Sequence, residues 1–427
     1  MGKIVIIGAG RTGRGFIGRL LAEGGAEFTF VDKDAALVDA LNAQGCYDVH
    51  FFGDVRLPFS VAGYQACTWQ NADLSDAELI FTAVGGSNLA DVGHSLAEKL
   101  VPGKAYYIIA AENAKGPSKT LKDAILEGGD SSASLAGGTS AETGQKLNEA
   151  DIRVSEATVF CTTIESGAIT GAAAGGENAS DGAVSGENAS DGPVSGIASA
   201  DDGAPARDLS IHSENYPYLQ FNADLLGDYV PEVPAIRPVK GFGDFLTRKL
   251  FTYNAASGII SYLGALKGYE NYAEAANDPE ILALMDHNYA VSNSVLCKLF
   301  GYDPKDQEEF AKLSRDKFLN RTIVDSIERN AHDPLRKIGP NERIMGPLRL
   351  ILQEGGDGSV LEKTAAALLC YRGVNEDKWD QVRAELSPEE ILRQYGGLTD
   401  EACLARILKY YETYSEAVAR GLQNLQL

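Results

Sequence analysis

The chain has 427 residues, and its balance of 44% hydrophobic and 23% charged residues is typical of a globular protein with enough apolar surface for two or three domains. The formal net charge of −22 argues against nucleic acid and anionic membranes as partners, because phosphate groups are bound by a surplus of Lys and Arg. The longest apolar run near the start, IVII, is too short for a membrane span or a signal peptide, so we expect a cytoplasmic protein.

The spacing of cysteine and histidine gives no sign of a disulfide framework or a metal site. The six cysteines include no C-x-x-C pair, and the five histidines include no H-x-x-x-H pair. We therefore expect reduced thiols and no bound metal. The sequence leaves the oligomeric state open.

Short apolar runs alternate with helical patterns up to about residue 125. Strand-like and helix-like segments follow one another in this order: 3–8, 14–25, 27–32, 35–45, 78–85, 95–100 and 105–113. Strand, helix, strand at this pitch is typical of a parallel sheet with crossover helices. The first half is therefore predicted to be an α/β domain.

A glycine motif lies between the first predicted strand and the first helix. Gly8, Gly10 and Gly13 fit the G-x-G-x-x-G pattern of a dinucleotide loop. The first glycine permits a tight turn, the second lets backbone N–H groups approach a pyrophosphate, and the third allows close helix packing. Arg11 and Thr12, inside the motif, belong to the same predicted cofactor contact.

The second predicted strand ends in Asp32, 19 residues past Gly13, where a carboxylate would accept hydrogen bonds from the adenosine ribose. A carboxylate at this position repels a 2′-phosphate, so NAD is preferred to NADP as the cofactor. Lys33 beside it keeps NADP open.

Two more strand ends are predicted to face the cofactor, since ligands lie at the carboxyl ends of parallel strands. At the first, Gly85 and Gly86 either let the backbone approach the cofactor or form a plain turn, and Val84 and Gly85 are the predicted cofactor contacts. The second carries Glu112 and Asn113. Asn113 either binds nicotinamide or substrate, or caps the following helix.

Residues 167–207 change abruptly to Gly, Ala, Ser, Asp and Glu. They contain the tandem repeat ENASDGAVSG and ENASDGPVSG, at residues 177–186 and 187–196. Units this short and polar cannot bury a core, so we predict a disordered insertion that grew by duplication.

Residues 208–222 alternate like a strand with one exposed face, and the stretch YVPEVPAIRPVKG then leads into a half with almost entirely helical patterns. We predict an N-terminal Rossmann-like dinucleotide-binding domain at residues 1–235, followed by a mainly α-helical domain at residues 236–427. A cleft between the two is the expected ligand site.

The stretch KLFTYNAASGIISYLG, residues 249–264, carries polar residues at helical spacing. At about 100° per residue, one face holds Lys249, Tyr253, Asn254, Ser257 and Ser261. This face is either solvated or the working surface of an enzyme. Asn and Ser are poor helix formers, unlike the Glu and Lys that usually fill solvated faces.

The stretch resembles the K-x-x-x-x-N-x-x-H signature helix of the polyol-specific long-chain dehydrogenases, the mannitol dehydrogenase family. GAGRTGRGFIGRLLAEGGAEFTFVD, FTAVG, IIAAEN and PLRKIGPNERI are also similar to that family's segments. The resemblance spans nearly the whole chain apart from the repeat insertion. It implies an NAD-dependent, metal-independent hydride transfer on a sugar or polyol, with mannitol 1-phosphate and fructose 6-phosphate as the best substrate pair.

The resemblance also implies roles for single residues. Lys249 is the expected general base and Asn254 the donor to the developing oxyanion. The family's histidine falls on Ser257, whose hydroxyl is shorter than imidazole and cannot share positive charge. In a second departure, the Asp and Arg of the family's S-x-V-D-R segment become Phe160 and Cys161.

The basic residues Arg336, Lys337 and Arg343 are retained in PLRKIGPNER. In an acidic protein they form either a clamp for a phosphate or carboxylate of the substrate, or helix-end ion pairs with Asp333 and Glu342. The substrate is thus predicted to be a small anionic sugar or polyol. Two alternatives stay open: a hexuronate or free-polyol reductase, and a non-catalytic NAD-binding relative.

Overall fold

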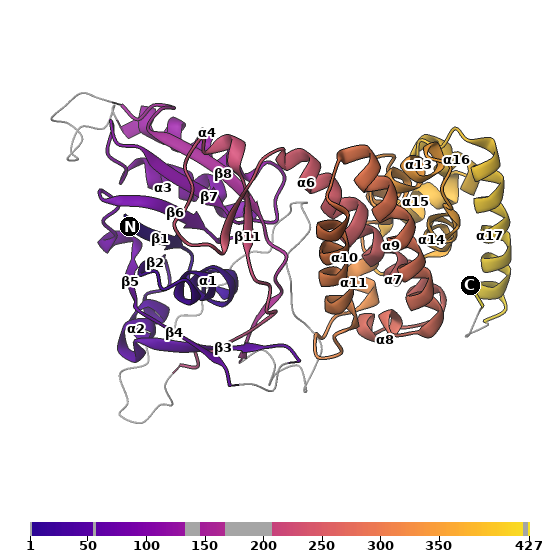
Figure 1. The fold of residues 1–427 in the computed structure, drawn as a ribbon, viewed down its shortest axis with the longest axis horizontal. Helices are drawn as coiled ribbons and strands as arrows, with labels where there is room; N and C mark the ends of the chain where they lie inside the picture. The colour runs from indigo at the N-terminus through magenta and orange to yellow at the C-terminus, as the bar shows by residue number, and fades with distance from the viewer. Residues whose placement is uncertain (1, 54–56, 133–145, 167–206, 422–425) are drawn as a thin grey trace. The chain divides into compact units, whose positions relative to one another are not determined.

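The computed structural model describes residues 2–53, 57–132, 146–166, 207–421 and 426–427 (Figure 1). Of the predicted insertion at residues 167–207, Arg207 alone belongs to the described residues. The chain divides into two compact units, residues 1–242 and residues 243–427. The predicted boundary between residues 235 and 236 precedes a strand that pairs within the first unit; as a domain boundary it stays a prediction.

Unit 1 is built on an eight-stranded sheet in the order β12-β11-β8-β7-β6-β1-β2-β5. Its strands are β1 (Lys3–Ile7), β2 (Phe28–Asp32), β5 (Tyr64–Thr68), β6 (Ala77–Thr82), β7 (Tyr106–Ala110), β8 (Ile152–Thr158), β11 (Leu219–Asn222) and β12 (Ile236–Val239). Every neighbouring pair is parallel except β11 with β8. The predicted α/β class is confirmed.

The sheet is covered on both faces because its strands are apolar on both sides. In β1, Ile4 and Ile6 pack with α1 (Arg19–Glu23) and α2 (Ala35–Gln44). Val5 and Ile7 point the other way and pack with α3 (Leu89–Ala97) and α4 (Pro117–Ser132). The alternation of side chains along a strand thus gives two cores, one on each face of the sheet.

A smaller sheet in the same unit has the order β4-β3-β10-β9. Its strands are β3 (Cys46–Phe51), β4 (Phe59–Ala62), β9 (Thr163–Glu165) and β10 (Ile211–Ser213). The prediction of one half-exposed strand over residues 208–222 is wrong, because β10 and β11 are separate strands in different sheets. Pro217 lies between them and has no N–H for a ladder. Their apolar residues are fully buried.

Glu165, before the predicted insertion, and Arg207, its last residue, each form an ion pair within unit 1. Glu165 pairs with the buried Arg14 at 2.9 Å, and Arg207 pairs with Asp34 at 2.9 Å. Arg14 lies in the π-helical turn Gly13–Gly18, which follows the glycine motif.

In its described residues, unit 2 is helical, as predicted. Its helices are α6 (Phe242–Lys249, of which Phe242 belongs to unit 1), α7 (Ala255–Leu266), α8 (Tyr272–Ala276), α9 (Pro279–Phe300), α10 (Pro304–Leu319), α11 (Ile327–Ala331), α12 (Pro334–Lys337), α13 (Met345–Gln353), α14 (Ser359–Cys370), α15 (Asp377–Glu385), α16 (Pro388–Gln394) and α17 (Glu401–Ala419). A π-helical turn, Leu250–Asn254, joins α6 to α7.

Helix α7 forms the centre of unit 2. It packs against α8, α9, α11 and α14, and all of its residues except Ala265 are buried. A helix that is enclosed all round needs apolar or small residues on every side, and AASGIISYLGAL supplies them. The alternative of a solvated polar face is therefore excluded for Ser257 and Ser261, which are 8% and 0% exposed.

Among the described residues, no helix has both the length and the apolar character needed to cross a membrane.

Candidate active site

The glycine loop after β1 has a geometry that needs glycine at two positions. Gly8 has φ 98°, and a Cβ there would lie 2.4 Å from the carbonyl oxygen of Ala83. A Cβ on Gly13 would lie 2.0 Å from the carbonyl oxygen of Gly8. Around Gly10, by contrast, there is open space. The loop therefore closes tightly at its ends and leaves room at its middle, which fits the approach of a pyrophosphate.

Asp32, at the end of β2, holds this loop in place. Its Oδ2 accepts from the Ala9 N–H at 2.6 Å, and its Oδ1 accepts from the Asp34 N–H at 2.9 Å. Each carboxylate oxygen has a second lone pair, so Asp32 can still accept from a ribose hydroxyl. Arg11 and Thr12 lie partly exposed at the start of the following helix.

Glu112, two residues after β7, binds the backbone of the turn that follows β6. Its carboxylate is buried and accepts from the N–H groups of Val84 at 2.7 Å and Gly85 at 3.0 Å. Burial raises the pKa of Glu112 to about 7, and the two N–H groups oppose that rise. Glu112 therefore links two of the strand ends that the sequence predicted to face the cofactor.

Gly85 has φ 87°, so the turn after β6 itself favours glycine. Asn113 is exposed, and α4 begins four positions later at Pro117. Asn113 is therefore not the N-cap of that helix. Its binding of nicotinamide or substrate stays a prediction.

In unit 2, Lys249 directly precedes the π-helical turn Leu250–Asn254, and Asn254 is its last residue. A π turn closes hydrogen bonds from residue i to residue i+5, so the ideal spacing of about 100° per residue does not hold across it. The expected placement of Lys249 and Asn254 on one regular α-helical face is therefore wrong in its angles. Both side chains are partly exposed, whereas most of α7 beyond them is buried.

Lys249 lies in surroundings that disfavour its charged form. Although Lys249 keeps some exposed surface, the protein atoms around it desolvate its ammonium group, and this burial lowers its pKa to about 8. The positive charges of Lys317 and Arg343 lower this pKa further. A lysine can accept a proton near neutral pH only when its pKa is lowered in this way. The environment of Lys249 therefore suits a general base.

Lys317 is a charged neighbour that the sequence analysis missed. It lies near the end of α10, and its Nζ is 5.4 Å from the ring centre of Tyr253 in the π turn. Phe318, the next residue, packs on the same ring at 4.8 Å. No local motif marks Lys317, because it reaches the π turn only through the packing of α10 against it.

The three predicted anion-binding residues do not act alike. Arg343 lies against α7, with its Cδ 3.6 Å from the position that a Cβ on Gly258 would take. Arg336 forms ion pairs with Asp333 at 2.6 Å and with Glu342 at 3.2 Å, as the alternative of helix-end ion pairs predicts.

Lys337 is buried, and its Nζ donates to the carbonyl oxygen of Asn330 at 2.7 Å. Burial, followed by the charges of Arg343 and Arg336, lowers the pKa of Lys337 to about 7. Of the three basic residues, only Arg343 is thus seen to influence the charge of Lys249.

Phe160 and Cys161, at the two departures from the expected S-x-V-D-R segment, serve packing in unit 1. Phe160 stacks on Tyr216 with ring centres 5.1 Å apart. Cys161 is buried, and its Sγ lies 3.2 Å from the carbonyl oxygen of Glu214.

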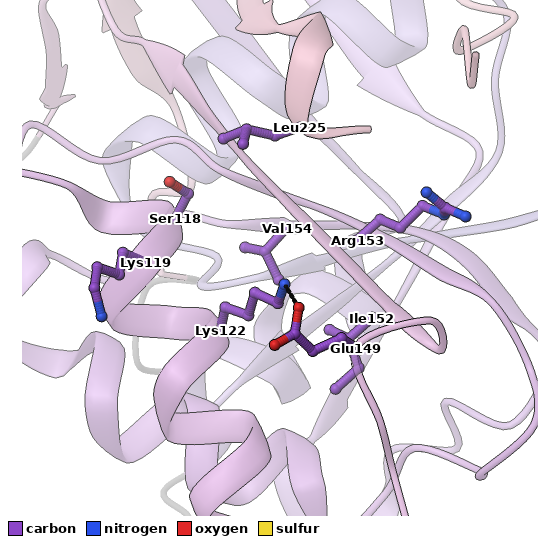
Figure 2. A pocket seen from close by; sticks show the side chains of 8 residues that line it. All are labelled: Ser118, Lys119, Lys122, Glu149, Ile152, Arg153, Val154 and Leu225. Atoms are coloured by element: carbon purple, nitrogen blue, oxygen red, sulfur yellow. Dashed lines mark hydrogen bonds and ion pairs between the residues drawn. The ribbon is translucent and has the colours of Figure 1, made fainter. Parts of the chain in front are cut away.

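A pocket of about 270 Å³ lies elsewhere in unit 1, between α4 and β8 (Figure 2). Lys122 and Glu149 form an ion pair at 3.0 Å in its wall. It contains none of the predicted site residues, so we do not assign it to the reaction. Among the described residues, no group of three His, Cys, Asp or Glu side chains is placed to hold a metal ion.

Comparisons with known proteins match both units. Residues 2–159 match the mannitol dehydrogenase Rossmann domain, and residues 242–421 match the mannitol dehydrogenase C-terminal domain. The fold is similar to that of a D-sorbitol dehydrogenase in substrate-free form, with TM-score 0.67 and 14% identity, over 98% of this chain and 93% of that chain. It is also similar to Pseudomonas fluorescens mannitol 2-dehydrogenase in a ternary complex with NAD and D-mannitol, with TM-score 0.56 and 14% identity, over 98% and 92%.

The raised pKa of Glu112 gives a test of its position. A carboxyl group with a raised pKa binds its proton more tightly in the folded state, so its contribution to stability is full below about pH 4.5 and is lost as pH rises through about 7. Between pH 5 and 8, the free energy of unfolding of the wild type should fall relative to that of Glu112→Gln by about 2–3 kcal/mol. Urea denaturation at several pH values measures this difference.

The matched control for this test is Glu149→Gln, because Glu149 is an exposed carboxylate of the same unit. Its curve should run parallel to that of the wild type. If the Glu112→Gln curve also runs parallel, Glu112 does not titrate in this range.

Proposed function

The chain belongs to the mannitol dehydrogenase family, and from this premise we propose that it is an NAD-dependent oxidoreductase that interconverts a polyol and its ketose by hydride transfer. The observation that carries the proposal is the position of Lys249 directly before the π turn that ends in Asn254, in the segment that resembles the family's signature helix. Burial there lowers the pKa of Lys249 to about 8, which supports the same role. A decayed site has no reason to keep a lysine in this environment together with Asn254. The proposal therefore favours an active enzyme over a non-catalytic relative.

The cofactor proposal rests on unit 1. The backbone around Gly8, Gly10 and Gly13 would hold the pyrophosphate, with Arg11 and Thr12 beside it, and Asp32 would accept from the adenosine ribose. Val84 and Gly85 are held by Glu112 at a neighbouring strand end. A mannitol 2-dehydrogenase of similar fold is described as a complex with NAD. Bound NAD supplies the hydride acceptor.

In the proposed mechanism, the chain's residues handle the proton and the developing charge. Neutral Lys249 takes the proton of the substrate hydroxyl while a hydride leaves the carbon that bears this hydroxyl. The resulting ammonium then releases its proton to solvent. Asn254 donates a hydrogen bond to the oxygen as it gains negative charge. In the reverse direction, protonated Lys249 returns the proton to that oxygen.

The substrate pair we favour is mannitol 1-phosphate and fructose 6-phosphate. An acidic protein that gathers Lys317 and Arg343 near Lys249 has a local positive potential, which supports an anionic substrate. Asn113, Arg336 and Lys337 remain proposed substrate contacts. A free polyol or a hexuronate is the second candidate, because Phe160, Cys161 and Ser257 depart from the family pattern. A cytoplasmic location and a metal-independent reaction stay predictions.

Purified protein assayed with a panel of fructose 6-phosphate, fructose and hexuronates should oxidise NADH in preference to NADPH. The preference follows from the carboxylate of Asp32, which repels a 2′-phosphate. Initial rates at 340 nm measure both choices. The absence of turnover with every substrate would reject the enzyme proposal, and a preference for NADPH would reject the role of Asp32.

Lys249→Ala should lower kcat by about 100-fold or more, because the general base is lost. The glycine loop lies in the other compact unit, so NADH binding should be retained. Steady-state rates and NADH fluorescence titration separate the two effects. Undiminished turnover in this variant eliminates Lys249 as the base.

Lys317→Gln should move the rise of the polyol oxidation rate to higher pH. Without the positive charge of Lys317, the pKa of Lys249 increases, so a smaller fraction of Lys249 is neutral at pH 7. A pH profile of kcat/KM measures the shift, and Lys317→Arg should keep the wild-type profile. The control is Lys312→Gln on the same helix, where Lys312 pairs with Asp316; an equal shift in this control would contradict the local effect.

A further inference from the structure

Gln307, on α10, has its whole side-chain amide bonded inside unit 2. The residue is fully buried, with 0% of its surface exposed. Its Nε2 donates to Thr252 Oγ1 at 2.9 Å and to Asn293 Oδ1 at 2.8 Å, and its Oε1 accepts from Arg248 Nε at 2.6 Å. Both amide hydrogens are therefore in use, and the three partners fix the orientation of the amide.

Two of these partners lie on either side of Lys249 in the chain. Arg248 directly precedes it in the last turn of α6, and Thr252 lies in the π turn that follows it. Thr252 is 0% exposed and Arg248 is 7% exposed, so their hydrogen bonds with Gln307 are shielded from water. Lys249 thus lies between two residues whose side chains are bound to the same amide.

Helix α10 contacts the π turn at a second place, closer to its C-terminal end. Lys317 Nζ lies 5.4 Å from the ring centre of Tyr253, and Phe318 packs on the same ring. Tyr253 directly follows Thr252, so α10 contacts consecutive residues of the turn. The helix that carries the charge of Lys317 is therefore also hydrogen-bonded to the turn through Gln307.

We propose that Gln307 is a positioning residue for the reaction: its hydrogen bonds to Arg248 and Thr252 fix the direction of the Lys249 side chain. A residue between two bonded neighbours cannot turn about the helix axis without breaking their bonds, and a buried hydrogen bond is costly to break. The inference rests on the proposed function, in which Lys249 is the general base.

The direction of Lys249 matters because charged groups on two other segments act on it. Lys317 on α10 and Arg343 before α13 disfavour its ammonium form, in addition to burial. If Lys249 turns away from these charges, its pKa rises toward the ordinary lysine value of about 10.4. A smaller fraction of Lys249 is then neutral at pH 7 and able to accept a proton.

Gln307→Met keeps the length of the side chain and removes its three hydrogen bonds. Arg248 keeps its ion pair with Asp306 at 2.8 Å, so its charge stays paired. The variant should lower kcat for polyol oxidation about tenfold, because the base is less often in place. The rise of kcat/KM should move to higher pH by about one unit, while KM for NAD should stay unchanged, since the glycine loop lies in the other compact unit.

A labelling experiment measures the same property of Lys249 without turnover. Acetic anhydride reacts with neutral amines, so the pH dependence of its reaction with Lys249, followed by mass spectrometry, reports the pKa of this lysine. That pKa should be about one unit higher in Gln307→Met than in the wild type, while the exposed Lys312 of α10 should be labelled alike in both. If the wild type oxidises no polyol, the proposed function fails, and the labelling still decides the inference.

Two variants of Thr252 test the same hydrogen bond from its other end, and they decide the inference if Gln307→Met does not fold. Thr252→Val removes the acceptor Oγ1, so it should raise the pKa of Lys249 as Gln307→Met does. Thr252→Ser keeps the acceptor and removes a methyl group, so the pKa of Lys249 should stay at the wild-type value even if the melting temperature falls. The double variant Thr252→Val with Gln307→Met should shift this pKa by less than the sum of the single shifts.

Ser314→Ala is the matched control. Ser314 lies about two turns further along α10, is 3% exposed, and its Oγ is paired with the Tyr289 hydroxyl on α9 at 2.7 Å. Its loss should lower the melting temperature and leave kcat and the pKa of Lys249 unchanged. The inference is overturned if this control shifts the pKa of Lys249 as much as Gln307→Met does, or if Gln307→Met and Thr252→Val both keep the wild-type value.

Discussion

A lysine can act as a general base near neutral pH only if its pKa is lowered, so that part of it is uncharged. In the helical unit, burial and nearby positive charges lower the pKa of Lys249. Lys249 lies where α6 gives way to the π turn, while Lys317 and Arg343 bring positive charge toward it from α10 and from the segment before α13. Each of these residues comes from a different part of the helical unit. The packing around α7 is therefore what sets the charge state of the lysine, and the proposed chemistry depends on that packing.

In the Rossmann-type unit, two carboxylates fix the loops that are proposed to bind the cofactor. Asp32 and Glu112 each accept two backbone N–H groups from loops at the carboxyl ends of the strands. These bonds fix the loops before any ligand binds, which reduces the conformational entropy that binding has to overcome. The same carboxylates therefore support the shape of the loops and leave lone pairs or nearby N–H groups for a cofactor.

Features that depend on short contiguous motifs can be predicted from the sequence. The glycine loop, Asp32 and the alternation of strands and helices follow from local spacing, and the α/β and helical units were predicted correctly. Lys317 could not be found in this way, because its approach to the π turn depends on how α10 packs. The spacing of about 100° per residue used for residues 249–264 assumes a regular α-helix. No residue in LFTYN indicates the π turn that the structure has there. The single strand predicted over residues 208–222 failed because period-two alternation does not show where pairing changes from one sheet to another.

The π turn makes the number of residues between Lys249 and Asn254 part of the site. A π turn holds one residue more per hydrogen-bonded ring than an α turn. If Leu250–Asn254 were a regular α-helix with the same number of residues, Lys249 would be rotated by about 100° relative to α7. Such a chain would keep its composition, its apolar pattern and its buried helix, yet its lysine would face a different neighbour. The direction of the Lys249 side chain therefore depends on the hydrogen-bonding pattern of this turn as well as on its sequence.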